Sequence, residues 1–466
     1  MNRTSACVSP VCTINSAART PARRRGIVIT LLAIAATTSS AFALAPGEDG
    51  VRVTIPISGI YDAAQAVVVD ASGNLVMAGS AGGNNSVLAS ITPAGALNPN
   101  FGIAGILDLD LSPGLGDSLR ALVRMSDGRM VGCGMFFSVG TATDFVVARF
   151  NSDGSLDATF DGVGFAVTPF SLTGAGGLLF DQCNAVAVQA DGMVVSAGFT
   201  AEAGPNHVAL TRHTASGQLD TLFGGGGKLD INAAATSNGN SEARAVAVQP
   251  DGKILVAGYA FGPGNAEFLI MRLNTDGSPD STFGSAGITR TPVGAGEDMA
   301  NAMVLQPDGR IVIAGSSIAA DGRRDFALAR YMTNGVLDTS FGTGGLVTTP
   351  VGPSDDIAYA LTLMPWGRLV AAGSARISTG GSGNDLAFVS YNADGSVDRY
   401  FGNDGTRMIN VSDFDDIIFG LVNDIDRYHF WAVGTASPTT SQDFLAIELG
   451  LDDTIFRHGF DTNTAP

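Results

Sequence analysis

Short hydrophobic runs separated by turn residues extend along most of the chain, and four of them in its middle form a unit. The runs at Ala245–Gln249, Ile254–Ala257, Phe268–Leu273 and Ile288–Val293 are rich in β-branched residues and bounded by Gly, Asp or Pro. Such runs are typical of β-strands. An Asp-Gly pair at 251 and 252 joins the first two runs and favours a hairpin. The unit therefore predicts a sheet of four antiparallel strands.

The same unit recurs seven times within this one chain. The copies start 55 to 64 residues apart, at Asp62, Asp117, Asp181, Ser241, Asp298, Asp356 and Asp416. A glycine closes the second run of every copy, at Gly79, Gly134, Gly198, Gly258, Gly315, Gly373 and Gly434. One four-stranded sheet per copy predicts an all-β fold, namely a seven-bladed β-propeller of four-stranded antiparallel blades.

The two ends of the repeat array are expected to meet. Residues 51–57 match the last run of a repeat, whereas the seventh copy has three runs and lacks a clear fourth. An N-terminal strand at 51–57 would complete the last blade. We therefore expect the propeller to cover residues 44–456, with a C-terminal tail at 457–466.

Three motifs carry a family resemblance. Residues 249–254 read Gln-Pro-Asp-Gly-Lys-Ile, residues 326–331 read Phe-Ala-Leu-Ala-Arg-Tyr, and residues 337–342 read Leu-Asp-Thr-Ser-Phe-Gly. They resemble the bacterial delta-60 repeat, a propeller-type repeat of unassigned function. The resemblance covers residues 47–456 and implies a propeller fold and an exported protein. It implies no catalytic residue.

The first 43 residues have the features of a secretory signal peptide. Arg23, Arg24 and Arg25 precede an apolar run at 27–36, and Ala41-Phe42-Ala43 provides a small-x-small cleavage site. We expect a secreted or periplasmic protein that has no transmembrane segment once this signal peptide is removed.

Net charge narrows the choice of partner. The formal charge is −18, and removal of the five arginines of the signal peptide takes it to −23. A surface of this sign repels phosphate backbones, so nucleic acid is not an expected partner. We expect a monomer whose partner is an unknown protein or a glycan.

A recurring arginine precedes a recurring aspartate by eight residues in copies two to five. The pairs are Arg149 with Asp157, Arg212 with Asp220, Arg272 with Asp280, and Arg330 with Asp338. The constant spacing predicts a structural salt bridge inside each of these blades, with the bidentate geometry that arginine favours.

The aspartates that open six of the seven copies are the candidate ligand residues. They are Asp62, Asp117, Asp181, Asp298, Asp356 and Asp416. Placed at the start of the innermost strand, they would surround one mouth of the central channel and could take a ligand, a Ca²⁺ ion or a basic partner. Alternatively, each carboxylate accepts hydrogen bonds from nearby backbone amides and fixes the start of its strand.

Other chemistry is sparse. The four histidines lack metal-ligand spacing, so no metal site is predicted and Ca²⁺ is the one candidate cofactor. Cys133 and Cys183 remain after signal removal and form either a disulfide or two buried free thiols.

Three functions follow from these observations. We favour a non-enzymatic binding or scaffold module. The first alternative is a propeller hydrolase or lyase that uses carboxylates at the acidic channel mouth. The second is a surface-attached structural protein. Residues that break the sevenfold pattern at the channel mouth would favour the enzyme, and an unbroken ring would favour binding or structure.

Overall fold

The computed structural model describes most of the repeat region. The described residues are 40–43, 51–82, 85–139, 142–170, 179–201, 204–237, 239–377, 383–424, 429–437 and 441–450. All of them belong to one compact unit, residues 33–466. Most of the expected signal peptide, and the expected C-terminal tail, lie outside these ranges.

The described part of the chain is built from strands, with a single 3-10 turn, η1 (Pro365–Gly367), as its one helical element. The strands pair antiparallel within groups of four, so the all-β prediction and the four-stranded antiparallel sheets are confirmed. No helix in these ranges is long and apolar enough to span a membrane.

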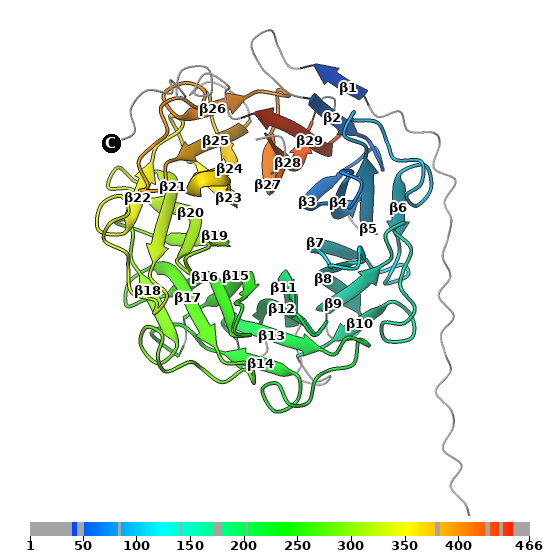
Figure 1. The fold of residues 1–466 in the computed structure, drawn as a ribbon, viewed down its shortest axis with the longest axis horizontal. Coiled ribbons are helices and arrows are strands. Elements are labelled where there is room, and N and C mark those ends of the chain that lie inside the picture. The colour runs from blue at the N-terminus through cyan, green and yellow to red at the C-terminus, as the bar shows by residue number, and fades with distance from the viewer. Residues whose placement is uncertain are drawn as a thin grey trace, which may run out of the picture. The chain divides into compact units, whose positions relative to one another are not determined.

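The first strand of each group lies nearest the centre in Figure 1. These strands are β3 (Ala63–Val69), β7 (Asp117–Arg124), β11 (Leu179–Val188), β15 (Ser241–Val248), β19 (Asp298–Leu305), β23 (Ile357–Leu363) and β27 (Ile417–Asp424). Each contacts the next in chain order, and β27 contacts β3. The second strands are β4 (Leu75–Ala81), β8 (Met130–Ser138), β12 (Val194–Thr200), β16 (Ile254–Phe261), β20 (Ile311–Ile318), β24 (Leu369–Ala375) and β28 (His429–Ala436).

The third and fourth strands lie progressively further out. The third strands are β5 (Asn85–Ile91), β9 (Ala142–Phe150), β13 (His207–His213), β17 (Ala266–Leu273), β21 (Arg324–Tyr331), β25 (Asp385–Tyr391) and β29 (Asp443–Gly450). The fourth strands are β6 (Ile106–Leu109), β10 (Phe165–Thr168), β14 (Lys228–Ile231), β18 (Ile288–Thr291), β22 (Leu346–Thr349) and β26 (Thr406–Ile409).

Two departures from the four-strand pattern occur. Against β29 lies β2 (Val51–Ile55), which pairs antiparallel from Arg52 opposite Ile447 to Ile55 opposite Phe444, and β1 (Ser40–Ala43) pairs with β2 in turn. A short parallel pairing between β9 and β11 also joins two neighbouring groups into one eight-stranded sheet.

Hydrophobic clusters fill the spaces between neighbouring sheets. Side chains along a first strand alternate between the two flanking clusters, as the period of two in a strand requires. On β3, for example, Val67 packs with Trp431 of the preceding sheet, whereas Val68 packs with Leu119 of the following sheet. The faces of each sheet are therefore used for packing, and only the edge of the first strand is turned toward the centre.

Candidate functional site

Every first strand carries a β-bulge at the same place, three residues after the position that opens the copy. In β15 the pairing with β16 shifts between Ala243 and Ala245, so Arg244 is the extra residue. The same shift falls at the equivalent residue of the other six first strands. A bulge leaves one residue outside the ladder and redirects its side chain.

The repeat glycine exists because of this bulge. A Cβ atom on Gly258 would lie 2.0 Å from the carbonyl oxygen of Glu242, a distance that no side chain tolerates. At the six equivalent glycines the corresponding distance is 1.8 or 1.9 Å. Glycine on the second strand thus lets the bulged backbone of the first strand approach.

The seven bulged side chains line one cavity of about 300 Å³, which we call the central cavity. Its lining consists of Gln65, Arg120, Asn184, Arg244, Asn301, Tyr359 and Phe419, one from each first strand. All seven are half-buried. Sequence reasoning missed them, although in five copies they occupy the variable position before the alanine of Asp-x-x-x-Ala. Copy four opens with Ser241 and copy seven has Gly420 in place of the alanine.

The lining has two chemically different parts. Five consecutive first strands supply Gln65, Arg120, Asn184, Arg244 and Asn301, which we call the polar arc. The next two supply Tyr359 and Phe419, the aromatic arc, whose ring centroids lie 5.4 Å apart at an interplanar angle of 57°. The ring of bulged residues therefore breaks the sevenfold pattern, and it contains no carboxylate.

Both asparagines of the polar arc are held by the neighbouring sheet. Asn184 Nδ2 donates to the Ala243 carbonyl oxygen and Asn301 Nδ2 donates to the Ala358 carbonyl oxygen, each at 2.9 Å. These bonds link two of the seven bulges to the next sheet and hold the two asparagine side chains in place.

The two arginines of the arc differ in their partners. Arg244 Nη2 donates to Glu242 Oε2 at 2.7 Å, and the guanidinium lies 5.8 Å from the ring centroid of Tyr259. Arg120 makes no ion pair or hydrogen bond to any residue that the structure describes, and its Nε is fully buried. Burial, followed by repulsion from Arg244, lowers the pKa of Arg120 against the attraction of the Glu242 carboxylate, although a guanidinium stays protonated in proteins.

The six opening aspartates lie elsewhere, and their carboxylates are used internally. All six are at most 2% exposed. Asp117 accepts backbone N–H bonds from Leu111 at 2.9 Å, Ser112 at 3.1 Å and Ser86 at 2.9 Å. The other five also accept one or more backbone amides from the connection that precedes them.

Copy four shows the same device with a different residue. Ser241 stands where the other copies have aspartate, and its Oγ accepts the Ala233 N–H at 3.2 Å. These side chains therefore fix the start of the first strand, which is the second of the two roles considered from sequence. Burial raises the pKa of Asp117 and that of Asp356 to about 6.

The structure brings together the four arginine–aspartate pairs in what we call the clamp. Arg272 Nε donates to Asp280 Oδ2 at 2.7 Å, and Nη1 donates to the Thr333 carbonyl oxygen of the next sheet. The guanidinium also lies 4.7 Å from the ring centroid of Phe283. The remaining pairs are Arg149 with Asp157, Arg212 with Asp220 and Arg330 with Asp338, each with its own Phe and its own carbonyl.

The clamp geometry differs from the bidentate fork expected from the sequence. Asp280 Oδ1 accepts the backbone N–H of Thr282 at 3.0 Å and its hydroxyl at 2.7 Å. Only Oδ2 is left for Arg272, and Lys253 Nζ shares it at 2.7 Å. The hydrogen bond from Lys253, with those from Thr282 and Arg272, holds the pKa of Asp280 well below its usual range against the effect of burial.

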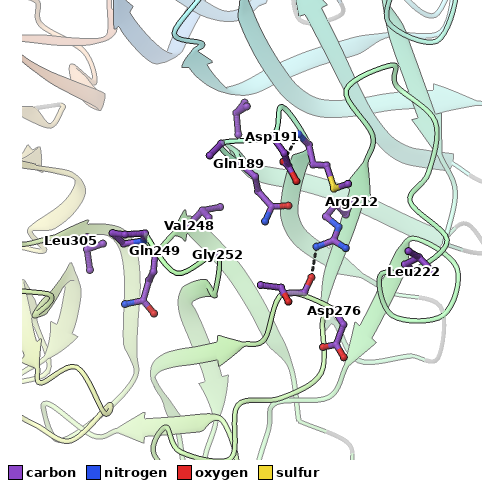
Figure 2. A pocket seen from close by; sticks show the side chains of 14 residues that line it. Gln189, Asp191, Arg212, Leu222, Val248, Gln249, Gly252, Asp276 and Leu305 are labelled. Atoms are coloured by element: carbon purple, nitrogen blue, oxygen red, sulfur yellow. Dashed lines mark hydrogen bonds between the residues drawn. The ribbon is translucent and has the colours of Figure 1, made fainter.

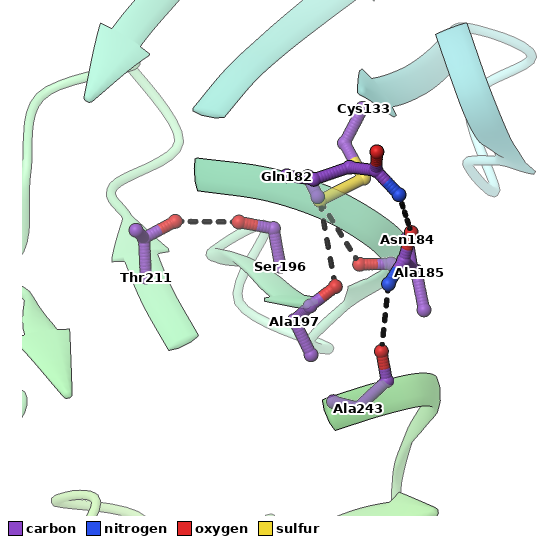
Figure 3. Close-up of a disulfide and its surroundings, with 9 residues drawn as sticks. Cys133, Gln182, Asn184, Ala185, Ser196, Ala197, Thr211 and Ala243 are labelled. Atoms are coloured by element: carbon purple, nitrogen blue, oxygen red, sulfur yellow. Dashed lines mark hydrogen bonds between the residues drawn. A yellow bond between two sulfur atoms is a disulfide. The ribbon is translucent and has the colours of Figure 1, made fainter. Parts of the chain in front are cut away.

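Cys133 and Cys183 are joined by a disulfide with a Cα–Cα distance of 5.9 Å (Figure 3). Cys133 pairs with Ala121, the residue after Arg120, and Cys183 precedes Asn184. Figure 3 shows Asn184 beside the disulfide and bonded to Ala243. The covalent link therefore joins two neighbouring sheets directly behind two residues of the polar arc.

A larger cavity of about 850 Å³ opens between the sheets of β11 and β15 (Figure 2). Its one cation, Arg212, donates to Asp220 and to the Thr275 carbonyl oxygen as part of the clamp. Leu222 at its rim is 82% exposed. Because Arg212 is already engaged, this cavity offers no unpaired cation to a ligand, although the buried Oε1 atoms of Gln189 and Gln249 accept no hydrogen bond from the described residues. Across the described ranges, no group of three or more His, Cys, Asp or Glu side chains could hold a metal ion.

Comparisons with known proteins agree with the fold. Four segments, residues 126–160, 249–283, 306–341 and 367–401, match a model described as a domain of unknown function (DUF5122) beta-propeller. The chain therefore contains a β-propeller repeat domain. No curated protein matches the sequence.

Several solved structures are similar over most of their length. A protein of unknown function from Dyadobacter fermentans DSM 18053 has a TM-score of 0.40 at 11% identity, over 85% of this chain and 98% of that one. The polysaccharide lyase Uly1 has a TM-score of 0.46 at 9% sequence identity, and the match covers 84% of this chain and 90% of that one. Sqt1 from Chaetomium thermophilum has a TM-score of 0.46 at 12% sequence identity, and the match covers 91% of this chain and 93% of that one. At these scores the likeness carries no functional information.

Proposed function

We propose that this chain is an exported, seven-bladed β-propeller of delta-60-type repeats that binds a small ligand in its central cavity without catalysing a reaction. The circuit of contacts from β3 to β27 and back supports seven blades. The pairing of β2 with β29 supports closure by the N-terminal strand. A disulfide behind the polar arc suits the oxidising setting of an exported protein.

One observation carries the binding role. The bulge and its glycine recur in all seven copies, yet the side chain that the bulge aims into the cavity is Gln, Arg, Asn, Tyr or Phe. A purely structural bulge would be served by one residue type in every copy, as the clamp arginine shows in copies two to five. A constant backbone device that presents varied side chains supports a ligand site. A broken ring was expected to favour an enzyme, but a lining without any carboxylate favours binding over acid–base catalysis.

The enzyme remains a second candidate because the ring of bulged residues is broken. Its carboxylate-based form loses support, since the cavity lining has no acid and the opening aspartates are buried against backbone amides. Tyr359 is the one lining residue able to donate or accept a proton, and burial raises its pKa. Its hydroxyl is therefore protonated at neutral pH and is a poor general base.

The test is a thermal-shift screen of the mature protein, residues 44–466, against neutral, anionic and cationic small molecules, a glycan panel and Ca²⁺. Gln65→Trp fills the central cavity, and Gln249→Trp places the same bulk in the larger cavity as a matched control. We expect a ligand whose stabilisation disappears in Gln65→Trp and persists in Gln249→Trp. A screen without hits, or hits indifferent to Gln65→Trp, would overturn the proposal and favour the structural role. Conversion of a hit to product would favour the enzyme.

A further inference from the structure

We infer that the central cavity takes a small carboxylate whose carbon skeleton carries one ring, either a flat aromatic ring or a sugar ring that presents a C–H face. The carboxylate lies on the Arg120 side, and the ring lies against Tyr359 and Phe419. This inference rests on the proposed function, because it names the ligand class of the same cavity.

Charge is the first step. The protein carries 44 acidic and 26 basic residues, yet the seven cavity positions include two arginines and no acid. Glu242 neutralises Arg244, with a second bond from Asn206 Nδ2 at 2.7 Å fixing the carboxylate. Arg120 makes no ion pair or hydrogen bond among the described residues, and the Glu242 carboxylate attracts it only from beyond ion-pair distance. Two guanidinium groups therefore share one carboxylate, which leaves a net positive charge at this side of the cavity. A half-buried cation that lacks a direct ion pair is costly, and an anion in the cavity lowers that cost.

The order of residues around the cavity is the second step. The first strands follow one another in chain order and close on themselves, so β11 lies across the centre from β23 and β27 (Figure 1). Asn184, between the two arginines, therefore faces the aromatic arc. A ligand that spans the cavity meets guanidinium donors at one end and aromatic rings at the other. Guanidinium suits a carboxylate, and aromatic faces suit a flat ring or the C–H face of a sugar.

Size is the third step. A cavity of about 300 Å³ is at the lower limit for small-molecule sites. A monomeric acid with a single ring fits, whereas a polymer chain does not fit inside. Each asparagine uses one of its two N–H groups on Ala243 or Ala358. The amides and the Tyr359 hydroxyl can still donate to a ligand, but the arginines are the charged donors that the cavity offers to an anion.

Two acids test which kind of ring the aromatic arc accepts. Phenylacetate carries an aromatic ring, and D-glucuronate carries a sugar ring. Calorimetric titration of the mature protein uses each acid, its uncharged counterpart (2-phenylethanol or D-glucose) and sulfate. We expect one of the acids to bind, its counterpart and sulfate to bind at least tenfold more weakly, and the affinity to fall with added salt.

Variants locate the two ends of the ligand. Arg120→Gln should weaken acid binding at least tenfold, whereas Arg323→Gln, which removes an equal charge from a side chain 57% exposed, should leave it unchanged. Phe419→Ala should weaken binding of the ring-bearing acid and leave acetate binding unaffected. Either acid supports the inference when it shows this pattern.

Three outcomes overturn the inference. Neither acid binds below roughly 10 mM; or the uncharged counterparts bind equally well; or Arg120→Gln behaves as Arg323→Gln does. If a neutral or cationic compound from the screen binds and is lost in Gln65→Trp while both acids fail, the binding function stands and only the ligand class is overturned.

Discussion

The clamp at the ends of the third strands and the central cavity along the first strands both contain arginines, but they use them differently. Arg272 of the clamp divides its donors between Asp280 and a carbonyl of the next sheet, and it stacks on Phe283. Arg120 of the cavity has no such partner within the described ranges. Where a position joins one sheet to the next, the repeat keeps its residues. Where a position faces the centre, the repeat keeps only the backbone device and varies the side chain.

The exceptions in the clamp follow the same logic. Copy one replaces both members of the pair, and Asn98 Nδ2 donates to Ser90 Oγ at 3.2 Å. Copy six replaces only the arginine, and Arg368 from the first hairpin supplies the cation at 3.2 Å from Asp398. The buried acid is thus either paired or removed, as the cost of an unpaired buried charge demands.

The largest loss of stability is expected from replacing a repeat glycine, because the bulged backbone packs where the Cβ atom of any other residue would lie. Gly258→Ala places a methyl group 2.0 Å from the Glu242 carbonyl oxygen, which should lower the free energy of unfolding by about 4 kcal/mol or more. Gly264→Ala is the matched control, because nothing lies within 4 Å of its Cβ position. Urea unfolding of the two variants measures the difference. Equal midpoints would mean that the bulge is not what the glycine protects.

A smaller loss is expected from the clamp. Arg272→Ala leaves Asp280 buried with only Lys253 as an ion-pair partner, which should cost about 3 kcal/mol and lower the melting temperature. The double variant Arg272→Ser/Asp280→Asn reproduces copy one and should recover part of the loss. An unchanged melting temperature in Arg272→Ala, or an additive loss in the double variant, would contradict the buried-charge explanation.

The strands were predictable because strand periodicity and turn residues are local signals. The runs expected at Ile254–Ala257 and Phe268–Leu273 lie within β16 and β17. The last run was expected to reach Val293 but β18 ends at Thr291, since Pro292 has no N–H to continue the ladder. Errors in predicted strand boundaries arise at the strand ends, where one or two residues decide whether the pairing continues.

The central cavity was not predictable in the same way. The position of the bulge is set by pairing between two strands, and a repeat motif records only residues that recur. Arg120 and Tyr359 fall on a position whose identity changes in nearly every copy, so the motif treats it as uninformative. The opening aspartates do recur, and so the motif indicates them as candidates. Their recurrence reflects a shared local role, in which each carboxylate accepts hydrogen bonds from backbone amides.

The opening aspartates and the clamp aspartates are expected to change the stability of the protein in opposite directions as the pH falls. Burial raises the pKa of Asp117 to about 6, so between about pH 4 and pH 6 the folded state holds a proton that the unfolded state has released. Stability from this group therefore falls as the pH rises through that window, by about 1 to 3 kcal/mol. Asp280 has a lowered pKa and acts in the opposite sense, since its stabilisation is lost as the pH falls below about 4.

Asp117→Asn tests this sign, because an amide does not titrate. Melting temperatures from pH 4 to pH 7 should fall less steeply in the variant than in the wild type. Asp251→Asn, on an exposed hairpin turn, is the control and should reproduce the wild-type slope. A wild-type slope of the opposite sign would mean that the backbone amides outweigh burial at Asp117.

The smallest effect is expected at Arg120, and it is the sharpest comparison with the clamp. Arg120→Ala removes the same side chain as Arg272→Ala, yet it breaks no hydrogen bond or ion pair among the described residues. It also relieves repulsion from Arg244, which outweighs the lost attraction to Glu242. The free energy of unfolding should therefore change by less than about 1 kcal/mol, and a small gain is the favoured direction. Urea midpoints of the two variants in the same buffer, without added anions, measure the contrast. If Arg120→Ala destabilised the protein as much as Arg272→Ala, its cation would serve the joining of sheets, and the distinction between a clamp that holds and a cavity that binds would fail.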